Sequence, residues 1–162
     1  AAGANDGTSE SDAWQTFAAI VWDGAGVVAG DTVNFSGTFT ETLTPDVSGT
    51  SSARIILDGS YGGELTEINA ATLPKGINIV AEQYITVKGF YAYDADDTVT
   101  GVNFNVEDCD GVIVEGCHAS GSLYDDFKID ISDDCIIRKC LSKKPDRRSF
   151  TISGAGSGTK TS

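Results

Sequence analysis

Four cysteines stand in two pairs, and their spacing limits the thiol chemistry that the chain can perform. The pairs lie in CDGVIVEGC (109–117) and CIIRKC (135–140), spaced C-x7-C and C-x4-C. A zinc site needs two close cysteine pairs, or histidines at defined offsets, whereas the first pair is widely spaced and His118 is the only histidine. Disulfides and buried free thiols are therefore the stronger interpretations.

The segment YDADD (93–97) brings Asp94, Asp96 and Asp97 into one short polar stretch. Calcium takes several oxygen ligands at close range, often from carboxylates in a loop. We therefore predict a candidate Ca²⁺ site at these three aspartates. The segment does not match an EF-hand loop, so an ordinary solvated turn, with no cofactor, is the alternative.

Three tyrosines are candidate carbohydrate-binding residues. Tyr91 and Tyr93 leave one expected strand, and Tyr124 lies in the corresponding segment one repeat later. Tyrosine rings can pack on sugars while their hydroxyl groups form hydrogen bonds. The alternative is that these rings cover apolar corners of the fold.

One basic cluster, KKPDRR (143–148), stands in a chain of formal net charge −13. Lys143 and Arg147 are candidates for contacting an acidic glycan, and the cluster could equally meet the acidic edge of a partner subunit. A solvated corner loop is the plainer interpretation.

The segments that must position these residues recur along the chain. GINIVAE (76–82) aligns with GVNFNVE (101–107) and with DFKIDIS (126–132) at an offset of 25 residues, and RSFTIS (148–153) follows at about 21. Each segment alternates apolar and polar residues with a period of two, which is typical of half-buried strands. The alignment predicts one outward column of Val80, Asn105, Asp130 and Thr151.

That column bears on catalysis, because hydrolysis of a glycoside needs two carboxyl groups about 5–9 Å apart. It contains a single carboxylate, Asp130. A lyase would also need a lysine or arginine base beside a neutralised carboxylate. The sequence identifies no catalytic set for either reaction.

A second strand follows the first in each row, and the matching segments are IILDGS (55–60), ITVKGF (85–90), VIVEGC (112–117) and CIIRKC (135–140). Their alignment puts Cys117 in one inward column with Phe90 and Cys140. Stacked strands lie about 4.8 Å apart. This spacing permits a Cys117–Cys140 disulfide by its Cα distance, and it equally suits a ladder of buried free thiols.

Short alternating strands that recur every 22–27 residues predict an all-β parallel β-helix, a solenoid of about four to five coils over residues 31–153. Residues 1–30 would form a cap. Within SDAWQTFAAIVWD (11–23), the helical spacing of Trp14, Phe17, Ala18 and Val21 predicts a short amphipathic helix with Ser11 or Asp12 as its N-cap. Residues 154–162 read as a flexible Gly/Ser tail or linker.

The stretch GANDGTSESDAWQTFAAI…AGDTVNFSGTFTETL, together with rows such as YITVKGF and GVIVEGC, resembles the start of a right-handed parallel β-helix of the pectate-lyase-like superfamily. The resemblance covers roughly residues 3–153. It implies an extracellular glycan ligand held along the outside of the solenoid, as in polysaccharide lyases, glycoside hydrolases, tailspikes and surface adhesins. Lyases of this superfamily often place Ca²⁺ on loop carboxylates.

The composition of the chain limits which partners it can bind and indicates where it is located. The net charge of −13 opposes binding to nucleic acid or to anionic membranes, and no stretch approaches the roughly 20 apolar residues of a membrane span. The four cysteines, the small-residue start AAGAN and the lack of methionine favour a processed, secreted protein. The resemblance to a superfamily that includes tailspikes and surface adhesins extends this expectation to a cell or virion surface.

Two functional hypotheses follow. In the first, the chain is an extracellular module that binds or processes polysaccharide, within a longer chain or an assembly. In the second, it is a non-catalytic structural protein of a surface, filament or virion. No capping element is evident after RSFTIS, so the second hypothesis expects coil ends to stack on other subunits.

Overall fold

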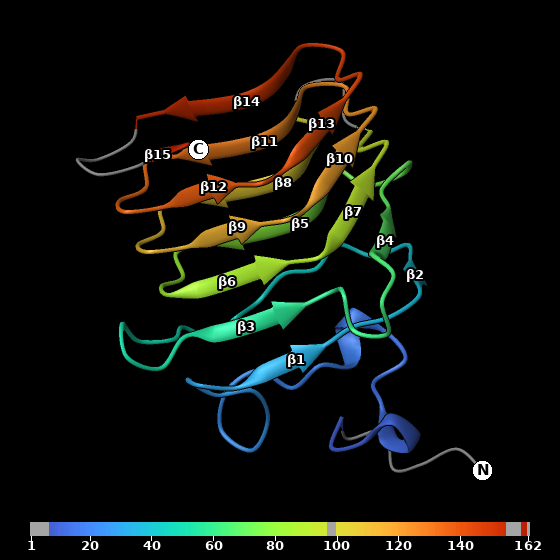
Figure 1. Ribbon diagram of the computed structural model, residues 1–162, viewed down its shortest axis with the longest axis vertical. Coiled ribbons are helices and arrows are strands. Elements are labelled where there is room, and N and C mark those ends of the chain that lie inside the picture. The colour runs from blue at the N-terminus through green and yellow to red at the C-terminus, as the bar shows by residue number, and fades with distance from the viewer. Residues whose placement is uncertain (1–6, 97–99, 155–159, 162) are drawn as a thin grey trace.

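The computed structural model describes residues 7–96, 100–154 and 160–161. The chain forms a parallel β-solenoid of about five turns from three sheets, which we name front, side and rear from their places in Figure 1. The front sheet contains, in order, β1 (Thr32–Asn34), β3 (Ile55–Asp58), β6 (Ile85–Lys88), β9 (Ile113–Glu115), β12 (Ile136–Arg138) and β15 (Lys160–Thr161).

The other two sheets complete each turn. The side sheet is ordered β2 (Thr38–Phe39), β4 (Thr66–Asn69), β7 (Phe90–Tyr93), β10 (His118–Ser120) and β13 (Leu141–Lys143). The rear sheet is ordered β5 (Lys75–Val80), β8 (Val102–Glu107), β11 (Asp125–Asp130) and β14 (Arg148–Ser153). In Figure 1 the chain runs rightwards along the front and leftwards along the rear as it rises, which is a right-handed winding.

The core is the space that the three sheets enclose. Alternation along each strand points one residue of every pair inward, and the parallel register stacks equivalent residues of successive coils, as in Val87, Val114 and Ile137. The rear sheet stacks Phe104 on Phe127, with ring centroids 4.7 Å apart and planes 17° from parallel. No coil could bury these side chains alone, so stacking of coils supplies the hydrophobic stabilisation.

Each corner of the solenoid uses residues with left-handed backbone at equivalent positions in successive coils. The columns are Gly89, Gly116 and Lys139 after the front strands, then Asp94, Gly121 and Lys144 after the side strands, then Ala81, Asp108, Ile131 and Gly154 after the rear strands, then Tyr84, Gly111 and Asp134 before the next front strand. Glycine adopts this conformation without strain, whereas a β-branched residue such as Ile131 is strained there.

One arginine joins three consecutive coils at the corner before the front sheet. The Arg54 guanidinium donates to the carbonyl of Ile85 at 2.9 Å in the next coil and to the carbonyl of Gly111 in the coil after that. Its Nε donates to Thr86 Oγ1 at 2.9 Å. Arg54 therefore links its own coil to the two coils that follow it through charge-assisted hydrogen bonds.

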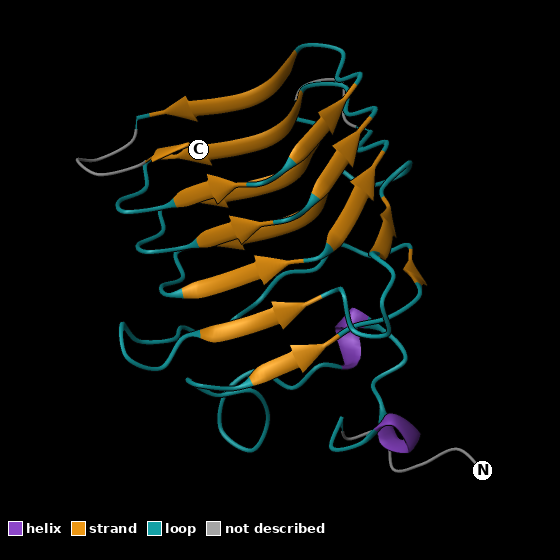
Figure 2. Cartoon of the chain, viewed as in Figure 1, coloured by secondary structure: helices purple, strands orange, loops and turns teal. Residues whose placement is uncertain are grey.

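The predicted N-terminal capping helix is wrong. Within the described residues, the N-terminal segment contains two short 3₁₀ helices, η1 (Glu10–Asp12) and η2 (Phe17–Ala19), and no longer helix (Figure 2). Phe17 and Ile20 are buried, whereas Val21, expected on the apolar face, is 51% exposed. A spacing of three residues fits the tighter 3₁₀ turn, so packing against the first coil prevails over the helical pattern.

The predicted register of the rear sheet is wrong by two residues. Phe104 pairs with Ile77 on one side and with Phe127 on the other, and Phe127 pairs with Phe150. A slip of two keeps side chains within a strand on their expected face, so Phe127 and Ile129 are buried as predicted although their partners differ. Ile131 was expected to continue the inward column, but it follows the end of β11 with left-handed backbone and is exposed. The front and side columns, including Phe90, Cys117 and Cys140, have the predicted register.

Two further observations concern the ends and the membrane. Most of the predicted tail at 154–162 lies outside the described residues, while Lys160–Thr161 pairs with β12 as strand β15. Among the residues that the structure describes, no helix has the length and apolar character needed to cross a bilayer.

Candidate functional site

The outer face of the side sheet carries aromatic and polar side chains in two columns. On β7, Phe90 and Ala92 are buried, so Tyr91 and Tyr93 point outward. The parallel register sets Tyr91 between Glu67 of β4 and His118 of β10. We call this surface the side face, and its second column contains Asn69, Tyr93, Ser120 and Lys143.

The two tyrosine rings form a tilted pair at the centre of the side face. Their centroids are 5.1 Å apart with an interplanar angle of 35°, and His118 lies edge-on to Tyr91 at 6.4 Å. The Tyr91 hydroxyl group is 2.8 Å from Ser120 Oγ, within hydrogen-bonding distance. These contacts hold the rings in place while both side chains stay partly exposed.

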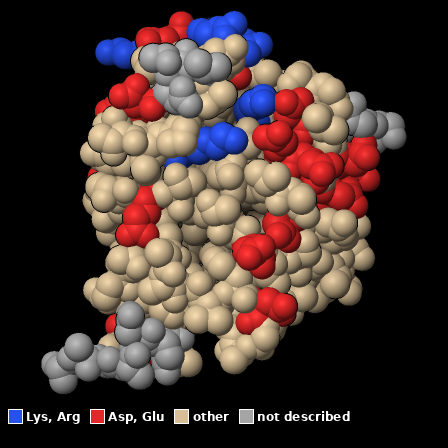
Figure 3. Space-filling view, turned by 180° about the vertical axis from the view of Figure 1, so that it is seen from behind, with Lys and Arg blue, Asp and Glu red and all other residues tan. Residues whose placement is uncertain are grey.

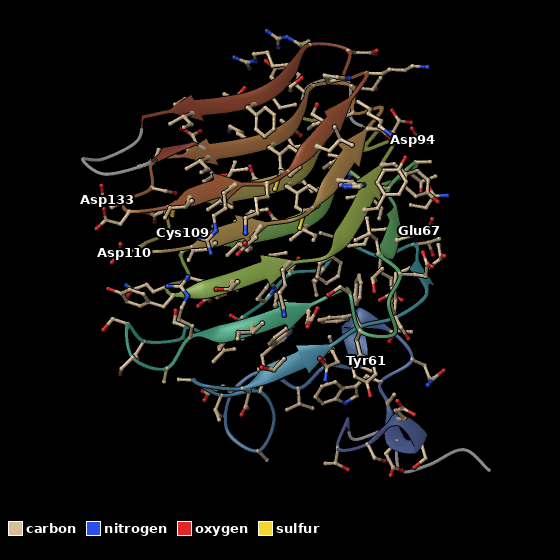
Figure 4. All side chains as sticks on the ribbon, viewed as in Figure 1. Tyr61, Glu67, Asp94, Cys109, Asp110 and Asp133 are labelled. Carbon is tan, nitrogen blue, oxygen red and sulfur yellow. The ribbon has the colours of Figure 1, made fainter. Side chains whose placement is uncertain are left out.

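Acidic groups flank the tyrosine pair. Figure 4 shows Glu67 and Asp94 on the same side of the molecule, at the side sheet and at the corner that follows it. Partial burial, together with the charges of Glu67, Asp94 and the neighbouring Tyr91, raises the pKa of Tyr93 above its ordinary value. A hydrogen bond with Asn69 acts on this pKa in the opposite direction. A tyrosine hydroxyl group is protonated at neutral pH with or without such a shift, and it can donate a hydrogen bond.

The structure separates the predicted sugar-binding residues into two groups. Lys143 belongs to the side face, because it pairs in register with Ser120. Tyr124 and Arg147 lie elsewhere, at the corner before the rear strands, where the Arg147 guanidinium covers the Tyr124 ring at 3.9 Å. Arg148 also approaches this ring at 5.6 Å. Tyr124 is thus engaged by cation–π contacts within the chain.

The predicted calcium residues lie beside the side face. Asp94 follows β7 with left-handed backbone, and the amide of Asp96 donates to the carbonyl of Leu73 at 2.9 Å. Asp97 lies outside the described residues. In the described part of the chain, no three His, Cys, Asp or Glu side chains are arranged to hold a metal ion. The Ca²⁺ site stays a prediction.

Two carboxylates lie side by side on the rear sheet. The sequence alignment, which is two residues out of register, placed Asn105 rather than Glu107 beside Asp130. Val80, Glu107, Asp130 and Ser153 form one outward column, so Glu107 and Asp130 are neighbours. Lys128 contacts Asp130 at 2.9 Å, and Lys75 approaches Glu107 at 4.0 Å. The hydrogen bond from Lys128 lowers the pKa of Asp130, whereas a general acid needs a raised pKa.

All four cysteines are free thiols, and three of them are buried. Burial raises the pKa of Cys117 well above its ordinary value and that of Cys135 to about 11. The half-buried Cys140 accepts a hydrogen bond from Cys117, which lowers its pKa. Because the thiolate is the reactive form, the buried thiols serve packing, and the Cys117–Cys140 column forms part of the interior wall.

Sequence reasoning named Tyr91, Tyr93 and Lys143 as candidates but did not name their neighbours on the side face, which are Glu67, Asn69, His118 and Ser120. The signal was present in the alternation of TEIN (66–69) and HAS (118–120) beside FYAY (90–93). These segments are too short to be recognised as strands by periodicity. Only the stacking of coils shows that they lie next to one another.

Models of known protein families, curated proteins and solved structures were compared with the chain, and none of the three comparisons finds a match.

Proposed function

We propose that this solenoid binds a polysaccharide on the side face. The observation that carries the proposal is the outward Tyr91–Tyr93 pair, with ring centroids 5.1 Å apart, set among hydrogen-bonding side chains. Tyrosine presents an apolar ring and a polar hydroxyl group, which matches the apolar faces and hydroxyl groups of a sugar.

The regular geometry of the sheet suits a repeating ligand. Strands of the side sheet lie about 4.8 Å apart, so donors and acceptors recur at a fixed interval along the column of Asn69, Tyr93, Ser120 and Lys143. A polysaccharide presents the same groups on each residue, and a column of this kind can contact several residues at once. For such a ligand we propose an extracellular location, which includes a cell or virion surface.

A titration with soluble polysaccharides tests the proposal. A panel of neutral and acidic polysaccharides is screened by affinity electrophoresis, and hits are measured by isothermal titration calorimetry. Tyr93→Ala should weaken binding at least 10-fold, because it removes the central ring. Tyr61→Ala is the matched control, since Tyr61 is exposed at a turn after β3, outside the side face. Loss of binding in both variants, or in neither, would contradict the proposal.

Processing of the ligand is a separate question with its own measurement. An assay for new reducing ends and for unsaturated products distinguishes binding alone from hydrolysis and from elimination. We propose binding without cleavage, because the rear-sheet carboxylates Glu107 and Asp130 both have lysine neighbours. Cleavage at a rate that responds to Glu107→Gln would place the chain among the enzymes instead.

An assembly role is the second candidate, and a specific observation favours it. Phe150 and Ile152 occupy inward positions of β14, yet each is 41% exposed because no described strand stacks on that coil. Exposed apolar side chains at the edge of a sheet favour association.

A further inference from the structure

Charge is polarised along the axis of the solenoid. Residues 1–53 contain no lysine or arginine, whereas six of the eleven basic residues lie between Arg138 and Arg148. Figure 3 shows lysine and arginine side chains gathered over the last coil at the top, while the lower half of that face shows acidic but no basic ones. The two ends of the molecule therefore differ in sign.

The last coil, which carries the basic cluster, also has exposed apolar side chains, and its rear strand β14 is an edge strand. Phe127 and Phe150 stack with ring centroids 5.0 Å apart and planes 6° from parallel, which leaves the far face of Phe150 exposed. Within the described residues, β14 has a neighbouring strand on one side only. Around it lie the exposed side chains of Lys143, Lys144 and Arg147.

The acidic end has exposed apolar side chains too. The loop beneath β1 in Figure 1 contains Val21, which is 51% exposed, and Val28, which is 38% exposed. Asp23 lies between them and is exposed, and the Asp31 carboxylate accepts from the Val28 amide at 2.8 Å. Next to this loop is an open cavity of about 1020 Å³, with Trp14 and Phe39 among its walls.

We propose that the last coil of one copy docks on the N-terminal end of a second copy, head to tail. This inference rests on the assembly role and is independent of glycan binding. The basic rim of Lys144 and Arg147 would face the acidic loop around Asp23, and apolar residues on both ends would be buried between them. Pairing two like ends would set cations against cations, so charge favours the heterologous arrangement, which can propagate into a filament.

Blocking one end at a time tests both the contact and its polarity. Val21→Lys adds a positive charge at the acidic end, and Lys144→Glu/Arg147→Glu reverses the basic end. All three side chains are exposed, so we expect both variants to fold, and circular dichroism checks this. Sedimentation velocity over a concentration series in low salt should show the wild type growing beyond dimers and each variant alone staying monomeric, with at least a 10-fold weaker self-association.

The decisive sample is the equimolar mixture of the two variants. Each retains one intact end, so a head-to-tail contact predicts dimers that do not grow further. Lys75→Glu, a charge reversal on β5 in the middle of the solenoid, should associate like the wild type. A wild type that stays monomeric at every concentration, or a mixture that stays monomeric, would overturn the proposal. So would end-blocked variants that associate like the wild type.

The same samples separate this inference from glycan binding. The end-blocked variants should bind polysaccharide with the affinity of the wild type, because neither changes Tyr91 or Tyr93. Tyr93→Ala should in turn leave the sedimentation profile unchanged. Raising the salt to about 0.5 M should weaken association, since salt screens exposed charges. Association that strengthens with salt would rule out the charge-directed contact.

Discussion

The front sheet and the side sheet have the same architecture but use their outer faces differently. On the front sheet, outward charges contact one another: Lys88 meets Asp58 at 2.8 Å, and Arg138 meets Glu115 at 2.7 Å. On the side face, none of the described residues forms an ion pair with another, and tyrosines occupy the centre. The front face is held together by ion pairs between coils, whereas the side face has neutral hydrogen bonds such as that between Tyr91 and Ser120.

This difference shows how a regular solenoid can assign stability to one outer face and leave another outer face free to vary. Every outward residue of a coil has neighbours about 4.8 Å away in the coils on both sides, so residues of opposite charge in one column pair with each other. Outward residues that form no ion pair with their neighbours can still interact with other molecules. The front sheet therefore stabilises the stack, while the side face can change without loss of the fold.

The largest expected effect comes from Arg54, at the corner that leads into the front sheet. Arg54→Ala should lower the free energy of unfolding by about 2–4 kcal/mol, because two backbone carbonyls in successive coils lose a charged donor. Chemical denaturation measures the change. The affinity for polysaccharide, extrapolated to the folded fraction, should not change, and a weaker intrinsic affinity would show that the two faces are coupled.

The side face should behave in the opposite way. The double variant Tyr91→Ala/Tyr93→Ala should weaken glycan binding about 10- to 100-fold, equivalent to about 1.4–2.8 kcal/mol. Its free energy of unfolding should change by less than about 1 kcal/mol, since both rings are only partly buried. Calorimetric titration and denaturation of the same sample provide the two numbers. A large loss of stability with unchanged binding would assign the tyrosines to the fold.

Substitution of a corner residue that belongs to neither face should increase the free energy of unfolding without changing glycan affinity. Ile131 has left-handed backbone with φ of 47° and is 61% exposed. Ile131→Gly should stabilise the chain by about 1 kcal/mol, because the strain of a β-branched side chain is relieved. Gly154 stands at the equivalent position one coil later. Thermal unfolding checks the prediction, and a lower midpoint would refute it.

The smallest expected effect concerns the ion pairs of the front sheet. Burial opposes ionisation of Asp58, but hydrogen bonds from Lys88 and Ser60 prevail and lower its pKa. A carboxylate with a lowered folded pKa contributes stability above its unfolded value near 3.9, and this contribution is lost as the pH falls through the folded pKa.

Asp58→Asn should therefore cost less than about 1 kcal/mol at neutral pH. It should also flatten the acid limb of the stability curve, measured by denaturation between pH 2 and about pH 6. Glycan binding should be unaffected at neutral pH. An acid limb identical to that of the wild type would show that Asp58 does not contribute to the pH dependence.

Local patterns were sufficient to predict the solenoid. The alternation in ITVKGF (85–90) and VIVEGC (112–117) predicted both the strands and their register, because the corner before each front strand has nearly constant length. The rear sheet was harder. Segments of different length precede Val102 and Asp125, so alignment on Gly76 and Gly101 gave a slip of two residues that the stacking of Phe104 on Phe127 corrects.

The site was only partly predictable for a different reason. Tyr91 and Tyr93 are recognisable by residue type, but Glu67 and His118 join them through pairing between coils. The N-terminal segment failed because helical spacing in Trp14, Phe17 and Val21 competes with the shape of the coil end. A short isolated helix is marginal on its own, so tertiary packing decides its conformation.

Because the left-handed corners repeat at equivalent positions, one coil can be deleted or duplicated as a whole. Val112 and Cys135 hold equivalent positions in adjacent coils, and the same corner conformation precedes each, at Gly111 and Asp134. In a chain that lacks residues 112–134, Gly111 would be followed directly by Cys135, which is equivalent to Val112. The strands on either side of the deleted coil would then pair with each other in the same register. Duplication of the same stretch would lengthen the solenoid by one turn. Lineages that carry this fold could therefore change the length of the side sheet in whole coils, through single recombination events and with the same corner conformations.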